Sequence, residues 1–161
     1  MQHQQSMTII RPLHADDAPR LLRLFKETIR QVKAADYSPA QIAAWASDEI
    51  SEADWAARFS GRFVVVAEAE GEIAGFAELE TDGRIDRFYV SARHQGLGVG
   101  RALLAALVDH AAQVDLGRLS ADVSITARPF FERQGFVVVA PQTVTLRGVD
   151  FLNYRMVQSL N

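Results

Sequence analysis

The chain has 161 residues, a formal net charge of −3 and no cysteine, and these values limit what it can be. This length suits one domain, and 48 % hydrophobic with 23 % charged residues is ordinary for a globular protein with a core. The acidic balance argues against a nucleic-acid partner, and the missing cysteines exclude disulfides, thiolate nucleophiles and cysteine-based metal sites.

No apolar run is long enough to span a bilayer, and residues 1–6 are polar, without the apolar stretch of a signal peptide. We therefore expect a cytoplasmic protein with no membrane partner. Residues 1–6 are expected to be a disordered tail, and residues 7–159 a single domain. His14, His94 and His110 lack the spacing of metal ligands, so no metal site is expected.

The N-terminal part of the chain predicts one strand followed by a helix. Residues 7–11 predict a short strand, which Pro12 ends. Asp16 or Asp17 can cap a helix that runs to about Lys33. The apolar residues of this helix recur at helical spacing: Leu21, Leu22, Phe25, Ile29 and Val32.

Two shorter helices and three strands are predicted next. Pro39 opens a helical segment over residues 41–47, and Ser51 followed by Asp54 is a capping signature for another. Runs of β-branched and apolar residues separated by glycine-containing turns then predict an antiparallel meander. Its strands are residues 63–69, 73–80 and 85–90.

A glycine-rich turn follows the third of these strands and precedes a helical pattern over about residues 98–114. It contains Gln95, Gly96, Gly98 and Gly100. Such a turn leaves the first N–H groups of the helix unpaired, and the helix dipole adds positive potential there. Together they favour the binding of a phosphate or pyrophosphate. Basic residues cluster around the turn: Arg84, Arg87, Arg93 and Arg101.

Other readings of this turn can be weighed. It lacks the lysine and hydroxyl residue of a P-loop, since Arg101 and Ala102 follow its last glycine. Its glycine spacing also differs from the dinucleotide-binding pattern. The remaining alternative is a turn that only lets a helix start close to a sheet.

The C-terminal part predicts one more strand, a short helix and a hairpin. Residues 119–123 predict a strand parallel to residues 85–90, reached by a right-handed crossover. Thr126 can cap a helix over residues 127–134, which Gly135 ends. Residues 136–146 and 151–157 predict a hairpin across residues 147–150. The fold class is therefore mixed α/β, with about seven strands and four or five helices.

This order of elements and two motifs resemble the GNAT acetyltransferase superfamily over nearly the whole chain. The turn from Gln95 to Gly100 matches the family's Arg/Gln-x-x-Gly-x-Gly/Ala pattern. The segment from Ala127 to Phe136 resembles the family's late helix ending in Gly-Phe. More narrowly, this segment and the ending RGVDFLNYRM resemble a bacterial subgroup of small uncharacterised N-acetyltransferases. The resemblance implies a GNAT-like central seven-stranded mixed sheet flanked by helices, and acetyl-CoA as the acetyl donor.

The resemblance also implies where acetyl-CoA (coenzyme A carrying the acetyl group) binds. The strand at residues 85–90 would splay from the next parallel strand, with the pantetheine arm hydrogen-bonded to backbone groups of Phe88, Tyr89 and Val90. The pyrophosphate would lie on the amides of the turn, with Arg101 assisting. These amides belong to Gln95, Gly96, Leu97, Gly98, Val99 and Gly100. A Cβ at Gly98 or Gly100 would push the phosphates off the amides.

Acyl transfer from a thioester to an amine needs a neutral amine, a donor for the developing oxyanion and a departing thiolate. The resemblance implies a backbone N–H near Tyr89 or Val90 as the oxyanion donor. Asp86, Glu78 and Glu80 are candidate bases that would act through water. The alternative for each is a solvated carboxylate at a strand edge.

Two positions depart from the family pattern near the sulfur of CoA. Phe131 stands where many members have a tyrosine that protonates the thiolate, and Ser124 stands where asparagine is common. A phenyl ring cannot donate a proton. Water, Tyr89 or Tyr154 would then substitute, or the thiolate would leave unassisted, because a thiol pKa near ~8.5 makes it an easy leaving group.

Tyr37, Trp45 and Trp55 fall in the helical segments that cover the acceptor site in this family, where they shape a pocket or fill the core. We expect an acetyl-CoA-dependent N-acetyltransferase that transfers the acetyl group directly to a primary amine of a small molecule in a ternary complex. A route through an acetyl-cysteine is excluded by composition. The alternative function is a non-catalytic acyl-CoA-binding sensor. The resemblance makes a homodimer the expected assembly.

Overall fold

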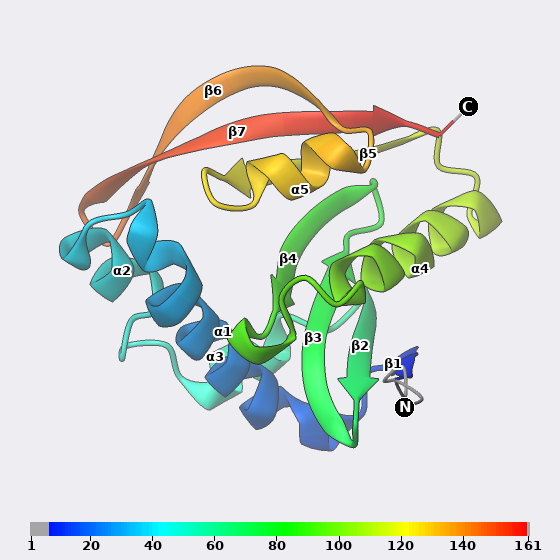
Figure 1. Cartoon of the computed structure of the whole chain (residues 1–161), viewed down its shortest axis with the longest axis horizontal. Coiled ribbons are helices and arrows are strands. Elements are labelled where there is room, and N and C mark those ends of the chain that lie inside the picture. The colour runs from blue at the N-terminus through cyan, green and yellow to red at the C-terminus, as the bar shows by residue number, and fades with distance from the viewer. Residues whose placement is uncertain (1–6, 161) are drawn as a thin grey trace, which may run out of the picture.

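One mixed sheet with helices on both faces contains the strands of residues 7–160, the part of the chain described by the computed structural model (Figure 1). The predicted tail, residues 1–6, lies outside the described residues. The strands are β1 (Thr8–Pro12), β2 (Phe63–Ala69), β3 (Glu72–Leu79), β4 (Arg84–Val90), β5 (Arg118–Ser124), β6 (Val137–Leu146) and β7 (Val149–Ser159). The helices are α1 (Ala18–Val32), α2 (Pro39–Trp45), α3 (Glu52–Ala57), α4 (Val99–Gln113) and α5 (Arg128–Arg133).

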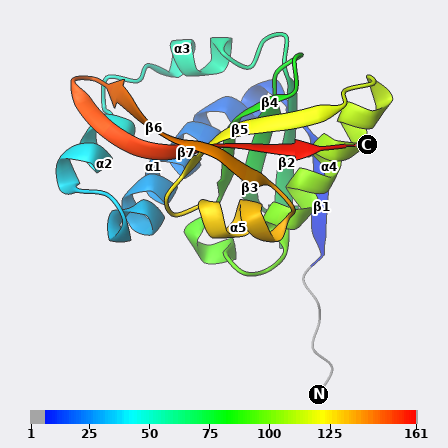
Figure 2. The ribbon, with the colours of Figure 1, turned by 90° about the horizontal axis from the view of Figure 1, so that it is seen from above.

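The strand order is β1-β2-β3-β4-β5-β7-β6, and all neighbouring strands are antiparallel except β4 and β5. This order confirms the predicted meander, the parallel step through α4 and the C-terminal hairpin. Seen from above, the hairpin of β6 and β7 reaches across toward α2 (Figure 2). The single domain over residues 7–159 stays a prediction, which the shared sheet supports. No helix within residues 7–160 is long and apolar enough to cross a bilayer.

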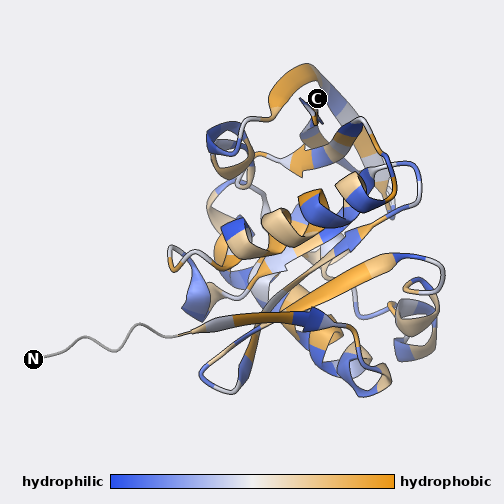
Figure 3. Cartoon of the chain, turned by 90° about the vertical axis from the view of Figure 1, so that its right-hand side faces the viewer, coloured by the Kyte–Doolittle hydropathy of each residue, from blue (hydrophilic) through white to orange (hydrophobic). Residues whose placement is uncertain are grey.

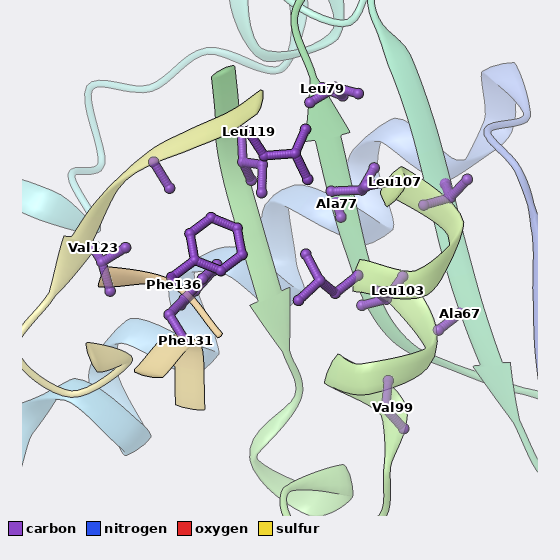
Figure 4. Close-up of a cluster of buried hydrophobic side chains, with 14 of the residues drawn as sticks. Ala67, Ala77, Leu79, Val99, Leu103, Leu107, Leu119, Val123, Phe131 and Phe136 are labelled. Atoms are coloured by element: carbon purple, nitrogen blue, oxygen red, sulfur yellow. The ribbon is translucent and has the colours of Figure 1, made fainter. Parts of the chain in front are cut away.

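The parallel contact between β4 and β5 is short. Only Arg84 pairs with Ser120 and Ile85 with Ala121, after which the two strands separate. In Figure 4, the strand that carries Leu119 and Val123 bends away from its neighbour. The edge of β4 that faces β5 is therefore left without strand partners beyond Ile85.

A β-bulge in β4 changes which side chains face each layer. Ala77 pairs with Phe88 and Leu79 pairs with Ile85, so Glu78 alone lies opposite two residues of β4. In a regular strand Ile85 and Phe88 would point to opposite faces. Because of the extra residue, both pack into the core layer that contains α4.

Two apolar layers hold the helices to the sheet. On one face α4 and α5 pack on the strands through residues that include Leu103, Leu107 and Phe131 (Figure 4). On the other face α1 and α3 pack through residues that include Leu21, Ile29 and Trp55. Figure 3 shows hydrophobic residues gathered on the central strands, while α4 alternates between hydrophobic and hydrophilic residues, as expected of a helix with one buried side.

Some predicted caps are confirmed and others are corrected. The Ser51 hydroxyl accepts the N–H of Asp54 at 3.0 Å, as its position predicts. Asp17 precedes α1, but its carboxylate accepts the N–H of His14 at 2.7 Å and pairs with Arg11 instead of capping the helix. Thr126 does not cap α5, because its hydroxyl donates to Asp36 at 2.8 Å. These side chains tie separate segments together, which local sequence does not reveal.

The turn of the C-terminal hairpin is tighter than predicted. Only two residues, Arg147 and Gly148, connect β6 to β7, and their φ angles are 48° and 76°. Two successive positive φ angles are typical of a type I′ hairpin turn. Asp150, predicted as part of the turn, pairs with Thr145, and the Thr145 hydroxyl donates to its carboxylate at 2.6 Å.

Candidate active site

A pocket of about 520 Å³ opens beside the C-terminal end of β4. We call it the donor pocket. Its wall is built by the end of β4, the glycine turn, the first turn of α4, the segment at α5 and the C-terminal end of α1. The residues predicted for acetyl-CoA that line it are Phe88, Tyr89, Val90, Gln95, Gly96, Gly98, Val99, Gly100, Arg101 and Phe131. Leu97 does not line it, since its side chain points to solvent with 60 % exposure.

The glycine turn presents unpaired N–H groups to this pocket. Gly98 is the N-cap of α4, with φ of 84°, and no side chain caps the helix there. Within residues 7–160, none of the N–H groups from Gln95 to Arg101 donates a hydrogen bond. A Cβ built on Gly96 or Gly98 would meet no atom within 4 Å, so the space above the amides is open. This arrangement fits a pyrophosphate.

Glycine is required at position 100 for a different structural reason. A Cβ at this position would lie 3.0 and 3.1 Å from ring atoms of Phe130. Gly100 therefore allows close packing of α5 against α4, within the protein itself. Of the four clustered arginines, Arg101 lines the pocket, whereas Arg84, Arg87 and Arg93 each pair with carboxylates within residues 7–160.

The backbone of β4 alternates between its two neighbours. The Ser91 N–H donates to Ala74 on β3 at 2.8 Å, so by alternation the backbone groups of Tyr89 also face β3. Those of Phe88 and Val90 face the gap toward β5. The Val90 carbonyl accepts a hydrogen bond from the Gln95 side chain at 2.7 Å, while its N–H stays available.

A second pocket of about 370 Å³ lies on the side of α2, α3 and the hairpin tip, and we call it the acceptor pocket. A narrow gap of about 60 Å³ between β4 and β5 shares residues with both pockets. Tyr89 lines all three spaces, packing edge-on against Phe25 with ring centroids 4.9 Å apart. Burial raises the pKa of the Tyr89 hydroxyl above its ordinary value.

Trp45 and Trp55 line the acceptor pocket, and Tyr37 does not. The Tyr37 hydroxyl donates to the Leu152 carbonyl and accepts the Ile125 N–H, each at 2.9 Å, which joins three segments of the fold. Trp55 is also buried in the core beneath α1, so it both fills the core and bounds the pocket.

Asp86 lies where the gap meets the acceptor pocket. Its carboxylate accepts hydrogen bonds from Arg62 at 2.5 Å and Arg58 at 2.8 Å, with Arg84 at 4.0 Å. Burial acts to raise the pKa of Asp86, but the three guanidinium groups outweigh it and hold the pKa below its ordinary value. Asp86 is therefore a carboxylate at neutral pH.

The other predicted acid–base residues lie away from the three spaces. Glu78 is fully buried at 0 % exposure, forms a two-bonded pair with Arg87 and lines none of them. Glu80 pairs with Arg62 and Arg84, each at 3.2 Å. Tyr154 on β7 lies under the guanidinium of Arg128, 4.4 Å from the ring centroid. Ser124 does line the narrow gap.

Lys33 is a site residue that the sequence reasoning missed. It follows α1 in a short 3₁₀ helix, Lys33–Ala35, and lines both the donor pocket and the narrow gap. Its side chain is buried, and Nζ donates to the Ser124 hydroxyl at 2.9 Å. Burial lowers the pKa of Lys33 to about 8, with an opposing effect from Asp36. The available signal was composition, because only two of the 17 basic residues are lysines.

Comparisons with known proteins agree on one family. The model of the acetyltransferase (GNAT) domain matches residues 33–158. The uncharacterised N-acetyltransferase YafP of Escherichia coli (strain K12) is 35 % identical over 147 residues, which cover 91 % of this chain and 93 % of that protein. A crystal structure of a GCN5-related N-acetyltransferase from Rhodopseudomonas palustris is 34 % identical, with a TM-score of 0.92 and 99 % of each chain covered. The PaiA N-acetyltransferase of Thermoplasma acidophilum in complex with coenzyme A shares the fold, at 19 % identity and a TM-score of 0.76 over 95 % of this chain and 99 % of that one.

Proposed function

The chain belongs to the GNAT acetyltransferase family and is an acetyl-CoA-dependent N-acetyltransferase, and we propose that it acetylates a primary amine of a small molecule by direct transfer in a ternary complex. The observation that carries this proposal is the donor pocket and the acceptor pocket meeting through one narrow gap, with Tyr89 lining all three. Two separate pockets let donor and acceptor be bound at the same time.

Different groups of the donor pocket would bind different parts of acetyl-CoA. The open amides of the glycine turn would hold the pyrophosphate, and Arg101 would add a positive charge beside it. The free backbone edge formed by Phe88 and Val90 would hydrogen-bond the pantetheine arm. The Phe131 ring would then lie along the arm near its reactive end.

The acceptor must lose protons during the reaction, because a free alkyl amine has a pKa near ~10.4. We assign to Asp86 two tasks in this step. Its negative charge at the edge of the acceptor pocket attracts the ammonium form, and its oxygen accepts the proton through a water molecule. Because its pKa is low, Asp86 is a weak base, so its negative charge carries the larger share of this role and water passes the proton on to solvent.

The oxyanion that forms at the thioester carbonyl needs a donor that is already in place. The Val90 N–H is the best candidate, since it faces the gap and the backbone of Tyr89 faces β3. A backbone donor of this kind cannot be removed by a side-chain substitution. Its role is supported here by the register of β4.

The proposal is tested by measuring CoA release with a thiol reagent across a panel of amines, polyamines and amino acids. The chain contains no cysteine, so the protein adds no signal of its own. We expect release that depends on one class of amine. Release at the same rate without any amine would show hydrolysis and contradict the proposal.

A matched pair of variants links the acceptor to its pocket. Leu146 lines the acceptor pocket at the hairpin tip, whereas Leu152 is exposed on β7 and lines none of the three spaces. We expect Leu146→Trp to raise KM for the amine several-fold and leave KM for acetyl-CoA unchanged. Leu152→Trp serves as the control and should change neither.

The homodimer also stays a proposal, and the edge strand β6 supports it. Val137, Val139 and Val144 are exposed on this strand at the end of the sheet. Sedimentation of the purified protein measures the assembly directly. The cytoplasmic location likewise stays a prediction.

A further inference from the structure

The family-type reaction leaves one task without a side chain in this protein. When the C–S bond of the thioester breaks, the sulfur departs as a thiolate that must take up a proton. Phe131 occupies the position of the family's proton-donating tyrosine and has no hydrogen to give. Another group at the reactive end of the donor pocket must therefore supply the proton to the sulfur.

Lys33 is a basic side chain that lines both the donor pocket and the narrow gap. It follows the C-terminal end of α1, and Phe131 on α5 lines the same two spaces. Within residues 7–160, Lys33 forms no ion pair. One of the three Nζ protons is donated to Ser124 at 2.9 Å, and Nζ lies 5.8 Å from the centroid of the Trp45 ring. Nζ forms no second hydrogen bond with the described residues, so its other protons can meet a ligand.

We infer that Lys33 is the proton donor to the thiolate of CoA in this protein, in place of the family's tyrosine. This inference rests on the proposed function and deepens it. Ser124 is the positioning residue, since its hydroxyl accepts from Lys33 and from the Ala127 N–H at 3.1 Å, which holds the ammonium at the gap.

The step balances in atoms and protons. The C–N bond forms as the C–S bond breaks, and the sulfur takes one proton from Lys33 Nζ to give the thiol. The acceptor nitrogen, already neutral after losing its ammonium proton, gives up one more proton through water near Asp86, and solvent returns one proton to Lys33. The net change is acetyl-CoA and amine to CoA and amide.

The acidity of Lys33 matches this task. A lysine at its ordinary pKa near ~10.4 is a weak acid toward a thiolate whose thiol has a pKa near ~8.5. Burial lowers the pKa of Lys33 to about 8, so proton transfer to sulfur is nearly balanced. An arginine would not release its proton at all. The pKa of Lys33 therefore suits a proton donor to sulfur, whereas an arginine at this position would not.

Other charges surround this group and shape its pH dependence. Asp36, the residue that follows the 3₁₀ helix of Lys33, favours the ammonium form. The remaining titratable and charged residues that line the same two spaces are Asp86, Tyr89, Asp122, His94, Arg101 and Arg133. We expect kcat to decline as pH rises through about 8, since the ammonium form is lost.

The first test needs no acceptor and no turnover. CoA is bound to the wild type and to Lys33→Met, and the thiolate absorbance of the complex is followed against pH. The chain contributes no thiol. A cation beside the sulfur favours the thiolate, so the pKa of the bound thiol should be higher in the variant by about 1 unit or more. Equal values in the two proteins would overturn the inference, whether or not an amine substrate is known.

The second test uses turnover. We expect Lys33→Met to lower kcat by roughly 10²-fold with both KM values unchanged. Adding Phe131→Tyr to this variant should restore much of the loss, since a phenol is then supplied from α5. Lys26→Met is the matched control, because Lys26 is the other lysine, lies on α1 and lines none of the three spaces. Unchanged kcat in Lys33→Met, or no rescue in the double variant, would contradict the assignment.

Two further measurements cover a variant that does not fold and acetylation of Lys33 itself. If Lys33→Met does not fold, Lys33→Gln keeps a hydrogen bond to Ser124 without an acidic proton, and it is judged by the same criteria. Intact mass is recorded after incubation with acetyl-CoA. Stoichiometric acetylation of Lys33 would make it an acyl acceptor and overturn its role as proton donor.

Discussion

At the scale of single residues, we propose that Gly98 allows a pyrophosphate to reach the amides of α4. Its φ of 84° and the empty space above its Cα suit a bound phosphate, and any side chain would occupy that space. Gly98→Glu adds both bulk and a like charge. We expect CoA binding, measured by calorimetry, to weaken by at least about 100-fold, which is about 2.7 kcal/mol.

The control for this variant is Gly61→Glu. Gly61 also has a positive φ, 76°, and open space around a built Cβ, but it lies outside the donor pocket. Both variants should lose similar stability, about 1 kcal/mol, from the strained backbone. Equal CoA affinity in the two variants would place the pyrophosphate elsewhere.

We predict that the buried ammonium of Lys33 lowers the free energy of unfolding of the protein at neutral pH. Its folded pKa of about 8 lies below the ordinary value, so the unfolded chain binds more protons between about pH 8 and 10.5. Stability should therefore rise with pH across this window. Lys33→Met should remove that rise and increase the free energy of unfolding at pH 7 by on the order of 2 kcal/mol. Urea unfolding at several pH values measures both effects.

Asp86 shows the opposite linkage. Its folded pKa is held below the unfolded value of about 3.9, so it contributes stability above that pH and loses it as pH falls through the folded pKa. Asp86→Asn should lower the free energy of unfolding at pH 7 by about 1–3 kcal/mol, because Arg58 and Arg62 lose their shared partner. The same variant should lower kcat at least 10-fold with unchanged CoA affinity. Full turnover would remove Asp86 from the reaction.

At the scale of elements, the close approach of β3 and β4 fixes the wall of the donor pocket. A Cβ on Gly75 would lie 2.6 Å from the Tyr89 carbonyl oxygen, so the two backbones must part to admit it. We expect Gly75→Ala to cost about 2–4 kcal/mol in unfolding free energy and to weaken CoA binding, since Tyr89 and Val90 move. Gly71→Ala, in a turn with no atom within 4 Å, should cost only about 1 kcal/mol and leave CoA binding unchanged.

Element positions follow from the sequence more readily than element details. The alternation over residues 63–90 and the helical spacing after Gly98 locate β2, β3, β4 and α4 correctly, since burial on one face imposes these periods. The bulge at Asp86 and Arg87 leaves no such trace. It coincides with the pairing of Arg87 and Glu78 across the two strands, a contact between residues nine apart in sequence. The separation of β4 and β5 was accessible only through the family resemblance.

At the scale of the whole molecule, the two pockets predict the kinetic order. We propose that donor and acceptor bind in separate spaces that meet at the narrow gap, so that neither would have to leave before the other binds. Initial rates at varied concentrations of both substrates should give intersecting double-reciprocal lines. CoA should compete with acetyl-CoA and not with the amine. Parallel lines would indicate an acetylated intermediate and exclude direct transfer.

The candidate site was only partly predictable for a physical reason. The glycine turn is local, so its amides can be recognised from adjacent residues. Lys33 and Ser124 are 91 residues apart, and only the fold brings them within 2.9 Å. Glu78 and Asp86 were both candidate bases in the sequence, and the fold separates them by giving Glu78 a buried arginine partner and Asp86 a place beside a pocket.

The hairpin tip belongs to one pocket alone. Arg147 donates to the Ala44 carbonyl at 2.8 Å and lies 3.5 Å from Glu49, so the loop between β6 and β7 forms part of the mouth on the acceptor side. Among the described residues that line the donor pocket, neither Arg147 nor Gly148 is found. Substitutions in this loop can therefore change which acceptor fits, while the site for the acetyl donor stays the same. Related sequences should diverge fastest at this loop and slowest at the glycine turn.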